Sequence, residues 1–435
     1  MTTSTLPQLY YSIDHCLLCL SRNLKQVVPL QPIPIATPVM HVPDDLRDDP
    51  RLYAGVPLNL NLCIDCGQIQ VSHKPDVEFE YRNYAYSTSL SAGLRDHFAA
   101  YAADVLEANP LPNGFVVEVG SNDGTLLRNF RDRGLKVLGV DPALRIAKEA
   151  TEAGLPTLAE FFTESLAKKI RAEHGAADVV IANFVTANLQ NMVDFAKGVR
   201  ALLADNGIAV FETQYGADVI EKNLLDTVYH EHVSYYTVTP LRDHYARHGM
   251  ELIDVKRVPT KGGSIRLTFQ PHGAGREPAP IVAEILAEEA RKGVTKPAYF
   301  EELPRWIARI RDEIGTLVAA EEAAGREVAG WGVSIGTSAL LPQFGLSTKI
   351  AFLLDDDTKK DPVLCGPDYN IPVVPVDELY ARNPGAIVVF AWRYIAAIME
   401  KHRAYLENGG TFIVPLPNVT VIRGADAQPP NTIGL

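Results

Sequence analysis

The stretch Phe115-Val-Val-Glu118-Val-Gly120-Ser-Asn122-Asp123-Gly124 decides the fold of the middle of the chain. It predicts a short apolar strand, a glycine-bearing turn and the start of a helix. A second apolar run, Lys136-Val-Leu-Gly-Val140, ends in Asp141, which lies 23 residues after Glu118. A unit of this kind binds a nucleoside, because glycines let the backbone approach the ligand and the acid accepts hydrogen bonds from ribose hydroxyls.

The spacing of the glycines separates two classes of cofactor. Glu118, Gly120 and Gly124 form the pattern E-x-G-x-x-x-G, which differs from G-x-G-x-x-G and lacks the spacing that grips a pyrophosphate. The pattern therefore favours S-adenosylmethionine (SAM) over NAD. The alternative is a strand-to-helix turn that binds no ligand.

The same alternation continues on both sides and predicts a doubly wound α/β domain. Apolar runs over 178–182 and 207–211 predict further strands, another lies before Glu160, and a helical pattern starts near residue 92. Because strands alternate with helices, we expect a mainly parallel sheet with ligands at the carboxyl ends of its strands. The cofactor-binding candidates are the loop residues Glu118, Gly120, Asp123 and Gly124 and the strand-end residues Asn122, Asp141, Phe162 and Asn183.

Four of the five cysteines lie before residue 70, as Cys16-Leu-Leu-Cys19 and Cys63-Ile-Asp-Cys66. Each CxxC pair directs two thiolates at one point, and two pairs complete the tetrahedron that zinc prefers. We expect one structural zinc, since four thiolates leave no coordination position open. Four reduced thiols without metal are the alternative.

Composition narrows the class of protein. The chain has 435 residues, which at roughly 150 residues per domain predicts about three domains. Its net charge of −12 disfavours nucleic acid as a partner. No stretch reaches the length of about 18 apolar residues that spans a bilayer, and the N-terminus does not resemble a secretory signal. A cytoplasmic enzyme without membrane contact is expected.

The sequence Tyr229-His230-Glu231-His232 is a candidate catalytic cluster. Imidazole titrates near neutral pH and a carboxylate can orient it, so acid–base chemistry fits better than a metal site. A solvated polar loop is the alternative. A second group, Tyr81, Tyr84 and Tyr86, supplies phenols that either hydrogen-bond a developing enolate oxygen or pack.

The rest of the chain predicts a second α/β unit. Lys261-Gly-Gly263-Ser264-Ile-Arg266 forms a tight loop against a ligand or another backbone, and residues 278–325 are helical. A glycine-rich strand-to-helix turn follows over 328–338, and a later strand runs into Asp355-Asp-Asp357. We expect this unit to hold a substrate nucleotide, with a solvated acidic loop as the alternative for Asp355-Asp-Asp357. The predicted domains are a zinc module (1–75), a SAM domain (76–255) and a substrate domain (256–435).

In the order of these parts the chain resembles the zinc-containing, SAM-dependent sugar C-methyltransferases. That family methylates C3, next to the ketone, of nucleotide-linked 4-keto-deoxysugars. The resemblance runs from Cys16 to about Val419. Its most specific parts are the two CxxC pairs, Val117–Gly124, Glu231-His232 and Phe390-Ala-Trp392.

The resemblance implies roles for the candidate residues and a monomeric enzyme. His232 is the base that removes the C3 hydrogen, Glu231 orients it, and Tyr84 and Tyr229 stabilise the enolate. The substrate-binding candidates are Tyr86, Lys261, Gly263, Ser264, Arg266 and Arg393. Because the tyrosines and the Glu-His pair serve an enolate, they favour carbon methylation over the alternative, methylation of oxygen on another nucleotide-linked or phosphorylated acceptor.

The chain departs from the family pattern at four positions near the expected substrate. Ala187 stands where a histidine is common, and Lys261 replaces a histidine before the Gly-Gly pair. Gly336 replaces a lysine, and Arg393 replaces an asparagine after Ala-Trp. Lys261, Arg266 and Arg393 are therefore candidates for phosphate recognition, because a cation there neutralises charge.

Overall fold

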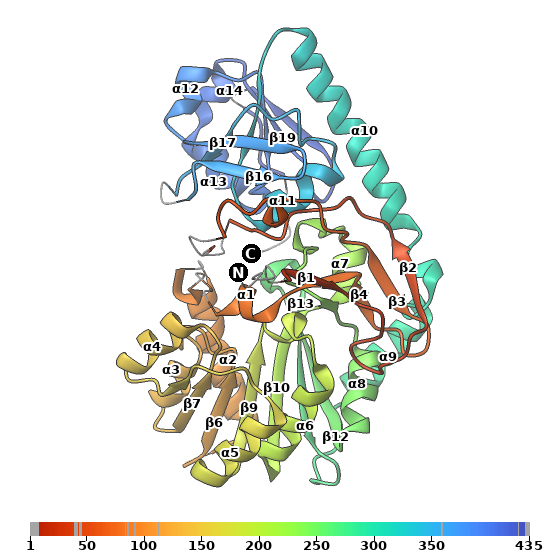
Figure 1. The fold of residues 1–435 in the computed structure, drawn as a ribbon, viewed down its shortest axis with the longest axis vertical. Helices are drawn as coiled ribbons and strands as arrows, with labels where there is room; N and C mark the ends of the chain where they lie inside the picture. The colour runs from red at the N-terminus through yellow and green to blue at the C-terminus, as the bar shows by residue number, and fades with distance from the viewer. Residues whose placement is uncertain are drawn as a thin grey trace, which may run out of the picture.

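The computed structural model describes residues 8–38, 42, 46–82, 84, 87–90, 93–111, 113–357, 360–424 and 426–430. Tyr86, one of the predicted substrate-binding residues, lies outside them. Figure 1 shows two α/β parts, with the N-terminal segment between them and the long helix α10 (Glu302–Ala323) leading from one to the other. The predicted fold class, an N-terminal four-cysteine group followed by two α/β units, is confirmed.

The N-terminal part consists of two small antiparallel sheets. β1 (Tyr10–Ser12) pairs with β5 (His73–Pro75), and a second sheet has the order β11-β4-β3-β2. Strand β11 comes from much later in the chain, so the N-terminal sheet is completed by the central part. The remaining elements are β2 (Leu24–Val28), η1 (Pro50–Leu52), β3 (Leu60–Cys63), β4 (Ile69–Val71), α1 (Val77–Tyr81) and β11 (Ser234–Tyr235).

The central sheet has the order β12-β13-β10-β9-β6-β7-β8. Neighbouring strands are parallel from β10 to β8, whereas β13 runs antiparallel to both β10 and β12. Its strands are β6 (Phe115–Val119), β7 (Lys136–Val140), β8 (Thr157–Leu158), β9 (Ala177–Asn183), β10 (Leu203–Gln214), β12 (Met250–Val258) and β13 (Ser264–Pro271).

Alternate side chains of the central strands enter two separate cores. On β6, Val116 packs with Phe98 and Phe130, whereas Val117 packs in the cluster of Phe195 on the other side. Since successive strand residues point to opposite faces, helices cover both faces of this sheet. The helical elements are η2 (Thr88–Leu90), α2 (Leu94–Ala108), α3 (Leu127–Arg131), α4 (Leu144–Glu152), α5 (Glu164–His174), η3 (Thr186–Asn188), α6 (Met192–Leu202), α7 (Gly216–Glu221), η4 (Leu225–Thr227), α8 (Val238–Arg247), η5 (Thr260–Gly262) and α9 (Pro280–Lys292).

The C-terminal sheet has the order β16-β17-β15-β14-β18-β19-β20. Its five inner strands are parallel, and the edge strands β16 and β20 are antiparallel to their neighbours. Its strands are β14 (Val328–Trp331), β15 (Leu353–Asp355), β16 (Val363–Gly366), β17 (Tyr369–Pro375), β18 (Ala386–Val389), β19 (Thr411–Val414) and β20 (Thr420–Arg423). The helical elements are η6 (Pro297–Phe300), α11 (Ile335–Gln343), α12 (Glu378–Arg382), η7 (Trp392–Tyr394), α13 (Ile395–Lys401) and α14 (Arg403–Glu407).

Strand β12 crosses the predicted boundary at residues 255/256, and β13 beyond it belongs to the central sheet. We propose that the C-terminal domain begins after Pro271, because this keeps the whole central sheet in one unit. In the described residues, none of the helices combines the length and the apolar character needed to cross a bilayer.

Candidate functional site

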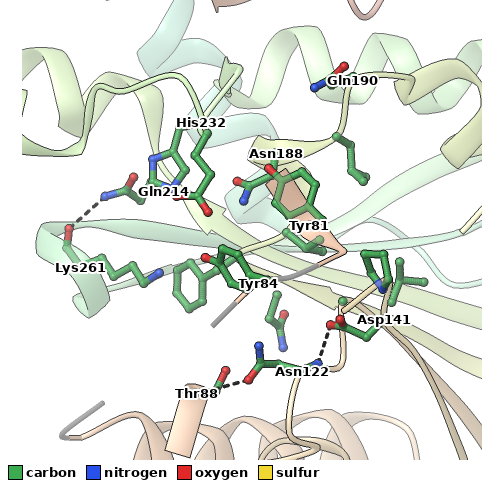
Figure 2. A pocket seen from close by; sticks show the side chains of 18 of the residues that line it. Tyr81, Tyr84, Thr88, Asn122, Asp141, Asn188, Gln190, Gln214, His232 and Lys261 are labelled. Carbon is green, nitrogen blue, oxygen red and sulfur yellow. Dashed lines mark hydrogen bonds between the residues drawn. The ribbon is translucent and has the colours of Figure 1, made fainter. Parts of the chain in front are cut away.

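A cavity of about 1340 Å³ lies where the three parts meet. The N-terminal part contributes His15 and Leu17 to its wall, and the C-terminal part contributes the start of α11 and Arg393. The rest of the wall comes mainly from the strand ends and loops of the central part (Figure 2). The predicted site residues that line it are Tyr84, Gly120, Asn122, Asp141, Phe162, Asn183, Tyr229, Glu231, His232, Lys261 and Arg393.

One end of the cavity is formed by the loop after β6 and by Asp141 at the end of β7. Asp141 accepts hydrogen bonds at Oδ2 from the backbone N–H of Asn122 (2.8 Å) and at Oδ1 from that of Ala143 (2.9 Å) (Figure 2). Burial raises the pKa of Asp141, and these two hydrogen bonds oppose the rise. Each carboxylate oxygen has a second lone pair, so Asp141 can accept two further hydrogen bonds from a ligand.

The turn itself requires unusual backbone conformations. Gly120 has φ of 70°, and a Cβ added there would lie 2.7 Å from the side chain of Val185. Asn122 has φ of 48°, and its Oδ1 accepts a hydrogen bond from the N–H of Thr88 (2.9 Å). The loop is thus held close to the segment that precedes α2.

Three of the predicted cofactor residues are not among the described residues that line the cavity. Asp123 accepts hydrogen bonds from the N–H of Ser89 (2.9 Å) and the hydroxyl of Thr125 (2.6 Å), so it shapes the loop. A Cβ at Gly124 would lie 2.4 Å from Leu155. Glu118 is buried on β6, and burial raises the pKa of Glu118 well above its usual range.

The other end of the cavity carries the predicted catalytic cluster. His232 is held at Nδ1, which donates to the carbonyl of Thr227 (2.9 Å), and its Nε2 accepts from the hydroxyl of Tyr229 (3.1 Å). The rings of Tyr229 and His232 are stacked, with centroids 4.2 Å apart. Burial, with a further effect of the Lys261 ammonium, lowers the pKa of His232 to about 3, so the ring is neutral.

His230 differs from His232, although only one residue separates them. It points into the N-terminal part, where its Nε2 donates to the carbonyl of Pro57 (3.2 Å), and burial lowers the pKa of His230 to about 4. It is absent from the described residues that line the cavity.

Glu231 lies between Tyr84 and Lys261, and both of these groups favour its charged form. Burial raises the pKa of Glu231, whereas a hydrogen bond with Tyr84 and the Lys261 ammonium oppose the rise. Burial, followed by the nearby Glu231, raises the pKa of Tyr84 well above its usual range, so the phenol stays protonated.

Sequence reasoning missed Glu80, which is 4% exposed. Burial and then the charge of Glu231 raise the pKa of Glu80 well above its usual range. A single Glu at the end of α1 carries no local signal of this proximity. Several polar residues of the cavity wall itself were also missed, among them Asn188, Gln190, Gln214 and Asp226.

The predicted substrate residues divide into two groups. Lys261 and Arg393 line the cavity, and Arg393 is ion-paired with Asp226. Arg266 is not among the described residues that line the cavity: its Nε donates to Glu212 (2.9 Å) and its Nη1 donates to Asp104 (3.0 Å). Phosphate recognition by Arg266 is therefore not supported, because Arg266 does not line the cavity and two carboxylates already pair with it.

The loop residues Gly263 and Ser264 have structural contacts of their own. The hydroxyl of Ser264 donates to the carbonyl of Thr260 (2.9 Å). A Cβ at Gly263 would lie 2.1 Å from a carboxylate oxygen of Asp218. Neither residue is among the described residues of the cavity wall, and the close approach that the glycines permit is to Asp218 rather than to a ligand.

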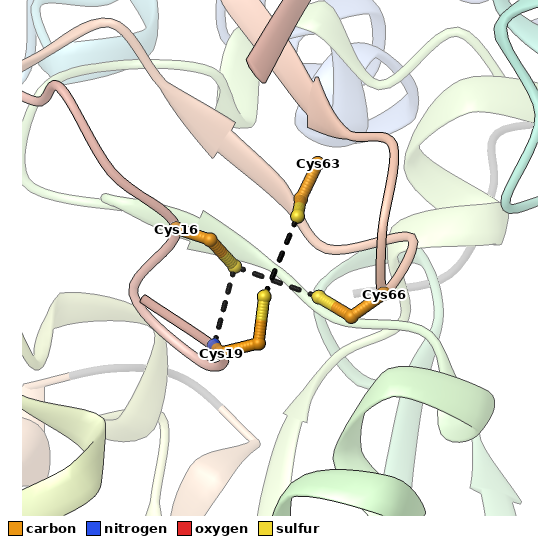
Figure 3. Close-up of side chains that lie close together, drawn as sticks. All are labelled: Cys16, Cys19, Cys63 and Cys66. Carbon is orange, nitrogen blue, oxygen red and sulfur yellow. Dashed lines mark hydrogen bonds between the residues drawn. The ribbon is translucent and has the colours of Figure 1, made fainter. Parts of the chain in front are cut away.

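The four predicted metal ligands come together (Figure 3). The sulfur atoms of Cys16, Cys19, Cys63 and Cys66 all lie within 4.8 Å of one another, and two pairs are 3.5 Å apart. Tetrahedral zinc with Zn–S bonds of about 2.3 Å places its sulfurs roughly 3.8 Å apart, so the group has the size of a zinc site. Amides of Leu18 and Cys19 point at the Cys16 sulfur, which stabilises a thiolate.

The sequence as a whole is similar to a curated enzyme. It is 33% identical over 414 residues to C-methyltransferase NovU of Streptomyces niveus, and the match covers 94% of this chain and 97% of that protein. Residues 94–255 match the family model of a methyltransferase domain, and residues 259–417 match that of the C-methyltransferase C-terminal domain. The chain belongs to the C-methyltransferase family. The enzyme is therefore a SAM-dependent C-methyltransferase, as the sequence predicts.

Solved structures are similar to this chain over less than half of its length. The PH0226 protein of Pyrococcus horikoshii OT3 has a TM-score of 0.36 and 14% identity, and the overlap covers 43% of this chain and 94% of that one. Magnesium protoporphyrin IX methyltransferase of Synechocystis PCC 6803, solved with bound SAM, has a TM-score of 0.31 and 14% identity over 41% of this chain and 79% of its own.

Proposed function

We propose that the C-methyltransferase acts on the carbon next to the ketone of a nucleotide-linked 4-keto-deoxysugar. The observation that carries this proposal is the single cavity that joins Asp141 and the turn after β6 to the cluster of Tyr84, Tyr229, Glu231 and His232. The first group suits a nucleoside, and the second suits removal of an acidic C–H proton.

At the cofactor end, Asp141 accepts hydrogen bonds from the ribose hydroxyls of SAM. Its oxygens are already aligned by two backbone N–H groups, which leaves the outer lone pairs for the ligand. Phe162 packs edge-on against Phe195 and offers an apolar wall beside the adenine, and Asn183 closes the end of β9. When bound, SAM supplies the electrophilic methyl group.

At the acceptor end, His232 takes the proton from the carbon next to the ketone. Its Nδ1–H is fixed by Thr227, so Nε2 is the basic nitrogen, and the hydroxyl of Tyr229 must turn from it as the substrate enters. Tyr84 remains protonated, and before the substrate enters its hydroxyl donates to the Glu231 carboxylate, which holds the phenol in place. To donate a hydrogen bond to the enolate oxygen, this hydroxyl must turn from Glu231 to the substrate.

The nucleotide of the acceptor lies toward the C-terminal part. Ser334 and Gly336, at the N-terminus of α11, line the cavity together with Arg393 and Tyr394. The side chain of Ser334 caps the helix, and unpaired N–H groups at such an end favour an anion. The Arg393–Asp226 pair fixes the guanidinium at the same wall.

The four-cysteine group holds a structural zinc in this proposal. Its four sulfurs are of one type and lie at the spacing of a closed tetrahedral site. The cysteines themselves are not among the described cavity residues, although their neighbours His15, Leu17 and Leu20 are. The metal would therefore support the wall of the cavity without taking part in methyl transfer.

The test is turnover with SAM against dTDP-, GDP-, UDP- and CDP-linked 4-keto sugars, with NMR to locate the new methyl group. A methyl group on the carbon beside the ketone is the expected result. A methyl group on oxygen would support the alternative acceptor, and failure to methylate any 4-keto sugar would refute this acceptor class.

A further inference from the structure

Lys261 is a partly buried cation at the catalytic end of the cavity. Its ammonium nitrogen lies 4.2 Å from the centre of the Phe184 ring. Neither a hydrogen bond nor an ion pair is found for this nitrogen within the part of the chain that the structure describes. Figure 2 shows the Lys261 side chain extending toward Tyr84, on the side of the view where His232 lies. A cation that is partly withdrawn from water and has no hydrogen-bonded anion gains stability when a ligand completes its surroundings.

The backbone of Lys261 is held in an unusual conformation. Its φ is 53°, in the left-handed region that a residue with a Cβ rarely adopts. Three hydrogen bonds fix the turn: Gln214 Nε2 donates to the Lys261 carbonyl (3.3 Å), Lys222 Nζ to that of Gly262 (3.1 Å) and Ser264 Oγ to that of Thr260 (2.9 Å). Strain of this kind clusters at functional sites, where it positions a side chain.

Charged groups of both signs surround Lys261. Burial, with a smaller effect of the Arg393 guanidinium, lowers the pKa of Lys261 to about 8, and the carboxylates of Glu231 and Glu212 oppose this fall. Arg393 is paired with Asp226, so the two cations differ in what they can offer a ligand. Lys261 has a complete set of donors for an oxygen that becomes negative.

We propose that the Lys261 ammonium is a catalytic residue that stabilises the enolate oxygen of the acceptor during methyl transfer. The inference rests on the proposed function, because it needs an acceptor that passes through an enolate. It departs from the phosphate role that the sequence predicts for Lys261.

The step balances without a further reactant. The C–H bond next to the ketone breaks, its proton goes to Nε2 of His232, and its electron pair moves to the carbonyl oxygen, where Lys261 and Tyr84 donate hydrogen bonds. The electron pair then returns to form the C–C bond as the S–CH₃ bond breaks. Lys261 keeps its proton throughout. The imidazolium is disfavoured beside Lys261 once the enolate charge has gone, so His232 releases its proton and the base is restored.

The test compares Lys261→Met and Lys261→Arg with the unaltered enzyme, using a dTDP-linked 4-keto-6-deoxysugar that the enzyme methylates. Lys261→Met should lower kcat by roughly 10²–10³-fold, the usual loss for one oxyanion donor, with little change in KM. It should also slow exchange of the acidic C–H with deuterated water in the absence of SAM. Lys261→Arg should retain part of both activities.

The pH profile supplies a readout that a structural role would not move. Because the protonated form is the active one, kcat/KM should fall as pH rises through about 8. Lys261→Arg should shift this fall to higher pH, since guanidinium stays charged. Lys349→Met, at an exposed pair with Glu322, is the control and should change neither rate nor profile.

Two results would overturn the inference, and they differ from failure of the proposed function. Unchanged exchange and pH profile in Lys261→Met would remove the enolate role. A loss confined to KM and nucleotide affinity would return Lys261 to phosphate recognition. If the unaltered enzyme neither exchanges the acidic hydrogen of any 4-keto sugar nor methylates one, the proposed acceptor class is wrong, and the enolate role of Lys261 is wrong with it.

Discussion

The central and C-terminal sheets contain the same arrangement of strand, turn, helix and second strand, and each second strand ends in an aspartate. Asp141 accepts from the N–H groups of Asn122 and Ala143, and Asp355 accepts from those of Val333 (2.7 Å) and Asp357 (2.9 Å). The two carboxylates thus have matching backbone surroundings. They differ on the side that these N–H groups do not contact, which we call the open side.

Lys360 fills the open side of Asp355. Its Nζ donates to Oδ2 of Asp355 (2.8 Å) and to the carbonyl of Val333 (2.7 Å). No cation holds Asp141 in this way among the described residues, and Asp141 faces the cavity of about 1340 Å³, whereas Asp355 faces one of about 270 Å³. The paired cation and the smaller cavity therefore distinguish Asp355 from Asp141.

The C-terminal unit therefore contributes to the site by a different route. Its helix α11 starts directly after the turn, with Ser334 as the cap, so the helix end rather than the acid reaches the large cavity. In the central unit the helix α3 starts later and the loop itself lines the cavity. The comparison predicts a SAM site in one unit and an anion-binding wall in the other.

The largest effect is expected from removing zinc from the N-terminal part, which is hydrogen-bonded to both units. The carbonyl of Leu18 accepts from His244 Nδ1 (3.0 Å), and Gln31 exchanges two hydrogen bonds with Gln343 of α11. Structural zinc contributes about 10–16 kcal/mol of apparent binding free energy in small modules. Removing it should therefore unfold this part and loosen the two units from each other.

Metal analysis and thermal unfolding check this prediction. Purified enzyme should hold one zinc per chain, and Cys63→Ser should lose it together with a large part of the melting temperature. Cys365→Ser, outside the cluster, is the matched control and should keep the metal. Metal-free enzyme with unchanged melting would contradict the assignment.

The second effect concerns the catalytic cluster, which comes from the central unit. His232→Asn removes the proposed base, and loss of a positioned base costs about 10²–10⁴-fold in rate, so turnover should fall by that factor. SAM affinity should stay unchanged, because His232 and Asp141 lie at opposite ends of the cavity.

Exchange of the acidic hydrogen with deuterated water, measured by NMR without SAM, follows the base alone. It should vanish in His232→Asn and persist in His230→Asn, since His230 faces Pro57 instead of the cavity. If exchange persists in His232→Asn and disappears in Tyr229→Phe, the phenol is the base.

The third prediction tests the two aspartates directly. Asp141→Ala removes acceptors for the ribose hydroxyls, and losing charge-assisted hydrogen bonds costs about 1.5–3 kcal/mol, or about 10- to 100-fold in SAM affinity. Asp355→Ala should leave SAM affinity as it is. Calorimetric titration of SAM into both variants measures the two affinities. Equal loss of SAM affinity in both would contradict the difference between the central and C-terminal units.

The sequence correctly predicted those features that are determined by residues close together in the chain. The turn after β6, the acid at the end of β7 and the two CxxC pairs are each encoded within a few residues, because strand ends and knuckles position their own side chains. The doubly wound central sheet followed from the same local alternation of strands and helices.

Partners far apart in the chain could not be predicted in this way. Arg266 is neutralised by Glu212 and Asp104, which are 54 and 162 residues away, and Arg393 by Asp226, which is 167 residues away. A cation in sequence shows its charge but not the carboxylate that packing brings beside it. Lys360 is only five residues from Asp355, yet the position of its ammonium also depends on a hydrogen bond to the carbonyl of Val333, which lies on another strand-end loop.

The smallest effect is expected for Lys360→Met, which tests directly whether the Lys360–Asp355 pair matters. The side chain of Lys360 is 24% exposed and that of Asp355 10%, so water can replace part of what the ammonium provides. The free energy of unfolding should fall by about 1 kcal/mol, the lower end for a buried acceptor that loses a partner. SAM affinity should not change, because Asp141 is unaltered.

The control is Lys349→Met, whose partner Glu322 is exposed. It should lower the free energy of unfolding, measured with denaturant, by less than Lys360→Met does. Equal losses in the two variants would show that Lys360 is an ordinary surface lysine, and the difference between the two units would then rest on the depth of their cavities instead of on a single cation.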